Sequence, residues 1–290
     1  MLPTLTQSKF IRPTIAVVGA GNFASGLAVS LHAAGYRITE ILSANRKSSR
    51  LKARTLARKV GATANIVRGF HVNANVVWLC VPDRAIAACA RSLASANWTG
   101  KIVLHSSGAL TSDELASLRQ RGARVASVHP MMTFVAGVTP SLRGVGFAVE
   151  GDREAVRVAR GIVAALGGES FIISKKNKAL YHAWGTFTSP LLTALLALSE
   201  RVALRAGVPR AKVRRWALPI LRQTLENYAK QGAAKGFSGP IVRGDAAIVQ
   251  KHLAVLKSVP TAREVYLALA RSALRTLPAR NRQQLKKVLD

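Results

Sequence analysis

Two kinds of hydrophobic pattern alternate along the first 174 residues of the chain. Short apolar runs rich in Val and Ile are each followed by a stretch whose apolar residues recur at helical spacing. Continuous apolar runs are typical of parallel strands buried on both faces. The predicted strands are 15–18, 36–43, 75–81, 101–104, 124–128, 146–150 and 169–174. Strands alternating with helices at short spacing predict an α/β fold with a Rossmann-type, doubly wound parallel sheet.

The pattern changes at residue 175. No strand pattern follows, and prolines interrupt long stretches of helical periodicity. We therefore expect two domains: residues 1–174 form a dinucleotide-binding domain, and residues 175–290 form an all-helical domain for substrate binding and dimerisation.

A glycine-rich turn joins the first predicted strand to the first helix. Gly19 lets the chain turn sharply out of the strand, Gly21 lets backbone approach a pyrophosphate, and Ala24 lets the helix pack closely. Together with Asn22 and Phe23, these residues are the expected pyrophosphate site at the helix N-terminus. Any tight strand-to-helix turn is the simpler alternative for so short a motif.

Residues at the end of the second predicted strand indicate which dinucleotide binds. An NAD site needs a carboxylate on the ribose hydroxyls there, whereas an NADP site needs cationic and hydroxyl groups for the 2′-phosphate. Glu40 is placed within the strand, because apolar residues continue beyond it. The candidates at the strand end are Ser43, Asn45, Arg46, Lys47 and Ser48. They favour NADP(H), with Arg46 first among them; a solvated charge run opening the helix at 49–60 is the alternative.

Three further strand ends carry polar or turn residues. They are Val81-Pro82, Ser106-Ser107 and His129-Pro130. Ligands of open parallel sheets bind beyond the carboxyl ends of the strands, so we expect these residues to line the cofactor and substrate cleft. For His129 a hydrogen bond to a loop is a slightly favoured alternative to substrate contact.

The chain is strongly basic, with 43 Lys and Arg against 13 Asp and Glu and a formal charge of +30. The excess is spread evenly, with 18 basic and 5 acidic residues in 1–150 and the remaining 25 and 8 in 151–290. There is no basic arm and no basic–aromatic interleaving. A generally cationic surface is therefore favoured over nucleic-acid binding as the main function, although an anionic substrate fits the charge.

Composition also bears on the compartment. Only Cys80 and Cys89 are present, without metal-ligand spacing, which is typical of a reducing compartment and predicts no metal site. Residues 1–12 have no apolar core typical of an export signal, so we expect a cytoplasmic protein. The uncharged stretch 179–199 is long enough to span a bilayer, but its first half is too polar. We expect a helix buried between protein surfaces, with no membrane contact, and a homodimer that covers its apolar side.

Five motifs together resemble a known family. They are Gly-Ala-Gly-Asn-Phe-Ala-Ser-Gly at 19–26, Ser-Ser-Gly-Ala-Leu at 106–110, His-Pro-Met-Met-Thr-Phe at 129–134, Tyr-His-Ala at 181–183 and Gly-Pro-Ile-Val-Arg-Gly-Asp at 239–245. The chain resembles bacterial Rossmann-like proteins with a C-terminal domain of unknown function. That family is similar to the 6-phosphogluconate dehydrogenase-like superfamily, which includes pyrroline-5-carboxylate reductase, prephenate dehydrogenase and 3-hydroxyacid dehydrogenases. The resemblance implies an NADP-type Rossmann domain, a helical dimerisation domain and hydride chemistry.

The helix beginning near Lys178 carries the candidate catalytic groups. In the hydroxyacid dehydrogenase relatives, a Lys followed four residues later by Asn acts on the reacting oxygen, whereas this chain has His182 at the fourth position. Helical spacing places Lys178, Tyr181 and His182 on one face, continued by Ser189. His182 is the first choice for general acid–base catalysis because the imidazole pKa lies near neutrality. A core histidine is the alternative.

The remaining roles in the candidate site are assigned as follows. Lys178 and Ser107 join His182 as candidate catalytic residues, while Asp245 joins His129, Tyr181 and Ser189 as candidate substrate contacts. For Arg243, beside Asp245, an ion-pair network is preferred. The expected function is an NADP(H)-dependent oxidoreductase acting on a small carbonyl, imine or hydroxy-acid substrate. The alternatives are a non-catalytic NADP-binding sensor or scaffold, and an NADP oxidoreductase that exchanges hydride with a deazaflavin.

Overall fold

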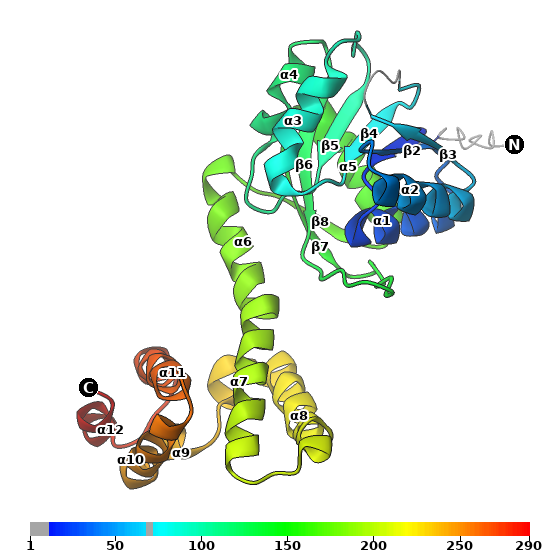
Figure 1. Cartoon of the computed structure of the whole chain (residues 1–290). Coiled ribbons are helices and arrows are strands. Elements are labelled where there is room, and N and C mark those ends of the chain that lie inside the picture. The colour runs from blue at the N-terminus through cyan, green and yellow to red at the C-terminus, as the bar shows by residue number, and fades with distance from the viewer. Residues whose placement is uncertain (1–11, 68–71) are drawn as a thin grey trace, which may run out of the picture. The chain divides into compact units, whose positions relative to one another are not determined.

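A computed structural model describes residues 12–67 and 72–290 of the chain. The described residues divide into two compact units, and along the chain the division falls between Thr188 and Ser189. Strands belong only to the first unit (Figure 1). The expected division at residue 174 coincides with the last strand, whereas the compact first unit also includes the helix that follows.

An eight-stranded sheet in the order β3-β2-β1-β4-β5-β6-β7-β8 forms the centre of the first unit. The strands are β1 (Ile15–Val18), β2 (Ile38–Ser43), β3 (Thr63–Ile66), β4 (Val76–Leu79), β5 (Ile102–His105), β6 (Arg124–Pro130), β7 (Gly146–Gly151) and β8 (Glu169–Ile172). All neighbouring pairs are parallel except β6 and β7. The Rossmann-type α/β prediction is confirmed; β7 and β8 run antiparallel to the other six strands.

Helices cover both faces of this sheet (Figure 1). They are α1 (Asn22–Ala33), α2 (Lys47–Val60), α3 (Asp83–Leu93), η1 (Ser112–Leu115), α4 (Ala116–Arg119) and α5 (Arg153–Ala165). Two further helices, η2 (Lys175–Asn177) and α6 (Lys178–Thr186), follow β8. One core joins α1, α2 and α5 to Ile15 and Val17, and the other joins α3 and α4 to Ala16 and Val18. Because successive strand residues point to opposite faces, the continuous apolar run of β1 supplies both cores.

One strand of the sheet differs from the sequence prediction, and one buried acidic residue agrees with it. The edge strand β3 was not predicted, because Thr63-Ala-Asn-Ile66 is half exposed and has a weak apolar pattern. Glu40 lies within β2 and is only 4% exposed, as predicted.

The second unit contains only helices among its described residues. They are α7 (Leu192–Arg205), α8 (Arg210–Gly236), α9 (Pro240–Arg243), α10 (Ala246–Val255), η4 (Leu256–Ser258), α11 (Ala262–Thr276) and α12 (Arg282–Leu289). Val249, Leu253, Ala270, Leu285 and Leu289 form its main core. The helical character predicted after residue 175 is confirmed. Pro240 begins α9 behind Gly239, as the Ser-Gly-Pro sequence predicted.

The apolar stretch predicted at 179–199 lies in one helical run, Lys175–Arg205, which passes Pro190 through the π-helical segment Phe187–Leu191. By length and composition the run could cross a bilayer, although one such helix is weak evidence for a membrane span. Lys178 and Tyr181 in α6 are buried, but α7 has no buried residue. Within one chain α7 is only partly covered, since Leu198 and Val202 pack on the cluster of Leu256, Val259 and Ala262. The expectation that this run is buried between protein surfaces stays a prediction.

Candidate functional site

A pocket of about 330 Å³ lies at the carboxyl ends of β1, β4, β5 and β6. Its lining residues are Gly21, Asn22, Phe23, Cys80, Val81, Pro82, Asp83, Ser106, His129, Pro130, Met132 and Phe134. Eight of them are candidates from the sequence, and they come from four separate strand ends. The parallel sheet brings them together because the carboxyl ends of parallel strands meet at one edge.

The glycine-rich turn has the shape that a dinucleotide needs. Gly19 adopts a φ of +121°, and a Cβ at this position would clash with the Cys80 carbonyl, so only glycine fits. Gly21 caps α1 without a side-chain hydrogen bond, and a Cβ there would meet no heavy atom within 4 Å. The first N–H groups of α1 therefore face the open pocket, where they and the helix dipole can bind an anion. Ala24 is fully buried below the turn.

The end of β2 carries the groups predicted for the 2′-phosphate. Asn45, Arg46, Lys47 and Ser48 are exposed at the start of α2, and no acidic residue lies in the first turn of that helix. Ser43 differs from this group, since it is 4% exposed and its hydroxyl donates to the Ala44 carbonyl at 3.3 Å. The accessible cations are thus Arg46 and Lys47.

Two aromatic side chains form a wall of the pocket. Phe23 on α1 and Phe134 after β6 pack edge to face, with ring centroids 5.0 Å apart. Phe134 also lies over Gly26, where a Cβ would come within 3.2 Å of its ring. The sequence motif contained Phe134, but no spacing rule identified it as a pocket residue.

Ser107 and Asp83 form a hydrogen-bonded pair beside the pocket. The Ser107 hydroxyl donates to Asp83 Oδ2 at 2.8 Å and accepts from the Leu110 backbone N–H at 2.9 Å. Ser107 is only 3% exposed, and its hydroxyl orients the pocket-lining carboxylate of Asp83; its catalytic role stays a prediction. Asp83 was not among the predicted site residues, although it directly follows the strand-end Val81-Pro82.

Lys178 lies below the same loop and has no exposed surface. Its ammonium donates to the Ser107 carbonyl at 3.0 Å and to the Ser127 hydroxyl at 2.7 Å. Burial lowers the pKa of Lys178 to about 8, against the opposing effect of Glu150 and Asp83. Lys178 is not among the residues that line the pocket, and its ammonium holds the Ser107 loop; its catalytic role stays a prediction.

His129, which lines the pocket, lies beside Tyr181 and His182 of α6. His129 Nδ1 lies 3.2 Å from the Tyr181 hydroxyl, and the rings of His129 and His182 are 5.8 Å apart, edge to face. Both imidazoles border Gly108, where a Cβ would lie 2.5 Å from His182 Cδ2 and 2.9 Å from His129 Nε2. Gly108 therefore leaves the space in which the two histidines meet.

These three groups differ in exposure and protonation. His182 is exposed, whereas Tyr181 is buried. Burial lowers the pKa of His129 to about 4, with further lowering by His182 and Lys178, so His129 is neutral at pH 7. Burial raises the pKa of Tyr181 to about 12. Of the three, His182 is the most exposed, and His129 is half-buried.

Two candidate substrate residues lie in the second unit. Ser189 is in the π-helical segment, and its carbonyl accepts from Thr193. Asp245 is the N-cap residue of α10 and pairs with Arg243 at 2.8 Å, the local ion pair preferred from the sequence for Arg243. Their contact with substrate stays a prediction.

Two family models match the chain. A Rossmann-like domain matches residues 3–130, and a domain of unknown function, DUF2520, matches residues 145–273. No curated protein matches.

Solved structures resemble the chain over nearly its whole length. A candidate NADP oxidoreductase from Bacteroides fragilis is 21% identical with a TM-score of 0.75, and the match covers 90% of this chain and 97% of that chain. A reductive aminase from Aspergillus terreus in complex with NADPH and ethyl-5-oxohexanoate is 17% identical with a TM-score of 0.64, covering 95% and 99%. A pyrroline-5-carboxylate reductase from Coxiella burnetii is 18% identical with a TM-score of 0.58, covering 96% and 98%. At these identities the likeness establishes a shared fold.

Proposed function

Since the chain combines a Rossmann-like domain with a domain of the DUF2520 family, we propose that it is an NADP(H)-dependent oxidoreductase. Its proposed substrate is a small carbonyl or imine compound, or the corresponding hydroxy acid in the reverse direction. The observation that carries the proposal is the pocket at the strand ends, where the uncapped start of α1, the Asp83–Ser107 pair and His129 converge. Similar folds occur in proteins whose names include NADP oxidoreductase and reductive aminase.

The residues present fit a dinucleotide with a 2′-phosphate. The N–H groups behind Gly21 would bind the pyrophosphate, and Arg46 and Lys47 would bind the 2′-phosphate. The only acidic residue of β2 is Glu40, which is buried within the strand and does not reach the strand end. When bound, NADP(H) supplies or accepts the hydride.

The protein's own part is to hold and move one proton. We assign this proton to a ring nitrogen of His182, which is exposed and borders the pocket residue His129. Neutral His129 is oriented by Tyr181 and can hydrogen-bond to the reacting oxygen or nitrogen without adding a second charge. Lys178 and Ser107 act indirectly. Lys178 holds the loop that carries Ser106 and Ser107, and the Ser107 hydroxyl orients Asp83.

The cofactor assignment is tested by calorimetric titration with NADPH and NADH. NADPH is expected to bind more tightly, and Arg46→Asp should reduce or reverse that preference, because it removes one cation and adds an anion at the 2′-phosphate. Arg54→Asp is the matched control, since Arg54 is an exposed residue further along the same helix. Equal affinity of the parent protein for both cofactors would refute the assignment.

The catalytic assignment is tested by NADPH oxidation with a panel of carbonyl compounds and imines. His182→Asn should lose turnover while keeping cofactor affinity, whereas His32→Asn, an exposed histidine on α1, should change neither. Tight NADPH binding without turnover of any compound would instead indicate a sensor or scaffold. A loss of NADPH absorbance with a deazaflavin, but with no carbonyl compound or imine, would identify the deazaflavin as the hydride partner.

We also propose a homodimer that covers the exposed leucines at and just before the start of α7. Leu191, Leu192 and Leu195 are 46%, 37% and 37% exposed in the single chain. Exposed apolar patches on a protein often mark sites where another protein binds. Light scattering should give twice the 30.9 kDa chain mass, and Leu195→Lys should shift the protein toward monomer.

A further inference from the structure

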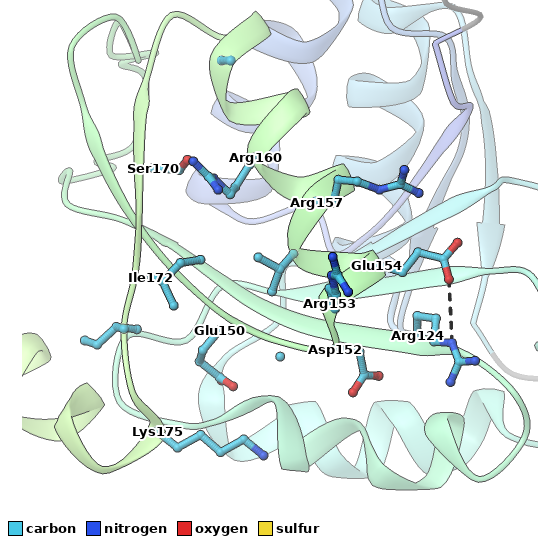
Figure 2. A pocket seen from close by; sticks show the side chains of 14 residues that line it. Arg124, Glu150, Asp152, Arg153, Glu154, Arg157, Arg160, Ser170, Ile172 and Lys175 are labelled. Carbon is cyan, nitrogen blue, oxygen red and sulfur yellow. Dashed lines mark hydrogen bonds and ion pairs between the residues drawn. The ribbon is translucent and has the colours of Figure 1, made fainter.

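A wide groove lies on the first unit, between α5 and the strands β6 to β8 (Figure 2). It begins at Arg124, at the start of β6, whereas the cofactor pocket is reached at the other end of this strand, at His129 and Pro130. The two share no lining residue. The groove has a volume of about 1370 Å³, which exceeds the ~300–1,000 Å³ typical of small-molecule pockets. Its size therefore suits an extended occupant.

Arginines from α5 give the groove its charge. Arg153, Arg157 and Arg160 follow one another at spacings of four and three, so they share one face of the helix. All three are exposed, and Figure 2 shows them on the helix beside the groove. Among the described residues, Arg153 and Arg157 have no hydrogen-bonded or ion-paired partner, and Arg160 donates only to the Ser170 hydroxyl, at 3.3 Å.

The acidic residues of the groove do not neutralise these arginines. Glu150 is 4% exposed, and its two carboxylate oxygens accept from the Ser112 N–H at 2.6 Å and the Ser112 hydroxyl at 2.9 Å. Asp152 accepts from the Val125 N–H at 2.8 Å and pairs with Arg119.

The third acid, Glu154, faces Arg124 at 3.7 Å (Figure 2). Both of these side chains are more than half exposed, so this pair is weak. The guanidinium groups of Arg153 and Arg157 are thus left available for an anionic partner.

The groove also has an apolar side and no aromatic residue. Val156, Ala164, Ile172 and Ile173 line it, and Ile172 is 61% exposed. Nucleobases bind proteins mainly by stacking on aromatic rings, whereas aliphatic side chains of a peptide pack on such a surface. The lining therefore favours a peptide over single-stranded nucleic acid.

Strand β8 ends the sheet and offers backbone groups to a further strand. The N–H of Glu169 donates to the carbonyl of Val145, just before β7, and the N–H of Ile173 donates to the carbonyl of Val149 in β7. In a parallel pair, alternate residues face the neighbouring strand, so Ser170 and Ile172 turn their backbone groups to the open edge. An extended peptide can add to such an edge through main-chain hydrogen bonds.

We propose that this groove binds an extended acidic peptide segment of a partner protein. The segment adds to β8 as a strand, and its carboxylates pair with the arginines of α5. The occupant is not a second copy of this chain, because its 43 basic residues outnumber its 13 acidic ones, and the homodimer proposed above uses apolar residues of α7 instead. The proposal is independent of the oxidoreductase activity.

Fluorescence anisotropy with a labelled eight-residue peptide of alternating Glu and Val tests the proposal, because an extended peptide of this sequence places all its carboxylates on one face. At physiological salt the full chain should bind it at least about tenfold more tightly than the peptide with Gln in place of Glu. Arg157→Glu should weaken binding about tenfold. Arg54→Glu, which makes the same charge change on exposed α2 surface, should weaken it less than about twofold.

A second measurement uses the unaltered protein. Hydrogen exchange at the amides of Ser170 and Ile172 should slow when the Glu–Val peptide is added, because both become hydrogen-bonded. Equal weakening by Arg54→Glu and Arg157→Glu, or no protection in β8, would overturn the proposal. So would a single-stranded oligonucleotide or an anionic lipid vesicle that binds through Arg157 while the Glu–Val peptide does not.

Discussion

The buried ammonium of Lys178 makes a prediction about how stability changes with pH. Its side chain has no exposed surface, and burial lowers its pKa from 10.5 to about 8. Below pH 8 the group is protonated in both the folded and the unfolded chain. Between pH 8 and 10.5 the folded state loses this proton while the unfolded state keeps it, so the unfolded state binds more protons and stability rises with pH.

The size of the effect follows from the two pKa values. Each pKa unit corresponds to about 1.4 kcal/mol, so the free energy of unfolding gains about 2.5 kcal/mol from this group between pH 7 and pH 10. Lys178→Met has a side chain of similar length without the titrating group, and it should lack this gain. All other ionisable groups are common to both proteins, so their contributions cancel in the difference.

Urea unfolding at several pH values between 7 and 10 measures the difference. Tryptophan fluorescence reports mainly on the first unit, because Trp78 and Trp98 are buried there, whereas Trp216 in the second unit is 53% exposed. The difference in stability between the parent protein and Lys178→Met should grow by about 2.5 kcal/mol across this range. A difference that is constant to within about 0.5 kcal/mol would show that the ammonium is not desolvated.

Three further predictions concern the turn and the histidines. Gly19→Ala should destabilise the protein by about 2 kcal/mol or more, because Gly19 has a φ of +121° and a Cβ there would meet the Cys80 carbonyl. Gly21→Ala should leave the melting temperature unchanged and weaken NADPH binding. A lower melting temperature for Gly21→Ala with an unchanged one for Gly19→Ala would contradict the assigned roles. The imidazole of His129 should titrate by NMR with a midpoint of about 4, and a midpoint near 6.5 would mean that the ring is solvated. Tyr181→Phe should lower stability by about 1 kcal/mol, since it removes the hydroxyl on His129 Nδ1; an unchanged urea midpoint would argue against that bond.

Much of the first unit could be predicted from local patterns. The run Ile15–Val18 and the turn at Gly19 specify a strand followed by a helix, because burial on both faces needs a continuous apolar run and the turn needs a positive φ. Glu40 could be placed inside β2 because apolar residues continue beyond it. Strand direction was not encoded in this way: an apolar run has the same periodicity in both directions, so the reversal of β7 depends on its pairing with β6.

The site could be predicted less completely than the fold. Helical spacing placed Lys178, Tyr181 and His182 on one side of α6, and all three contact residues at the carboxyl ends of β5 and β6, but the spacing could not indicate how deeply each is buried. Burial separates their roles, since Lys178 is enclosed under the Ser107 loop while His182 is exposed.

The sequence by itself determined the Rossmann-type order of elements, the glycine turn and the basic end of β2, because each depends on neighbours along the chain. Only the tertiary structure decided that Asp83 pairs with Ser107, that Gly108 makes room for two imidazoles, and that the arginines of α5 lie beside an open strand edge. These features join residues far apart in sequence, and their chemistry depends on burial and distance. Neither quantity is present in a local pattern.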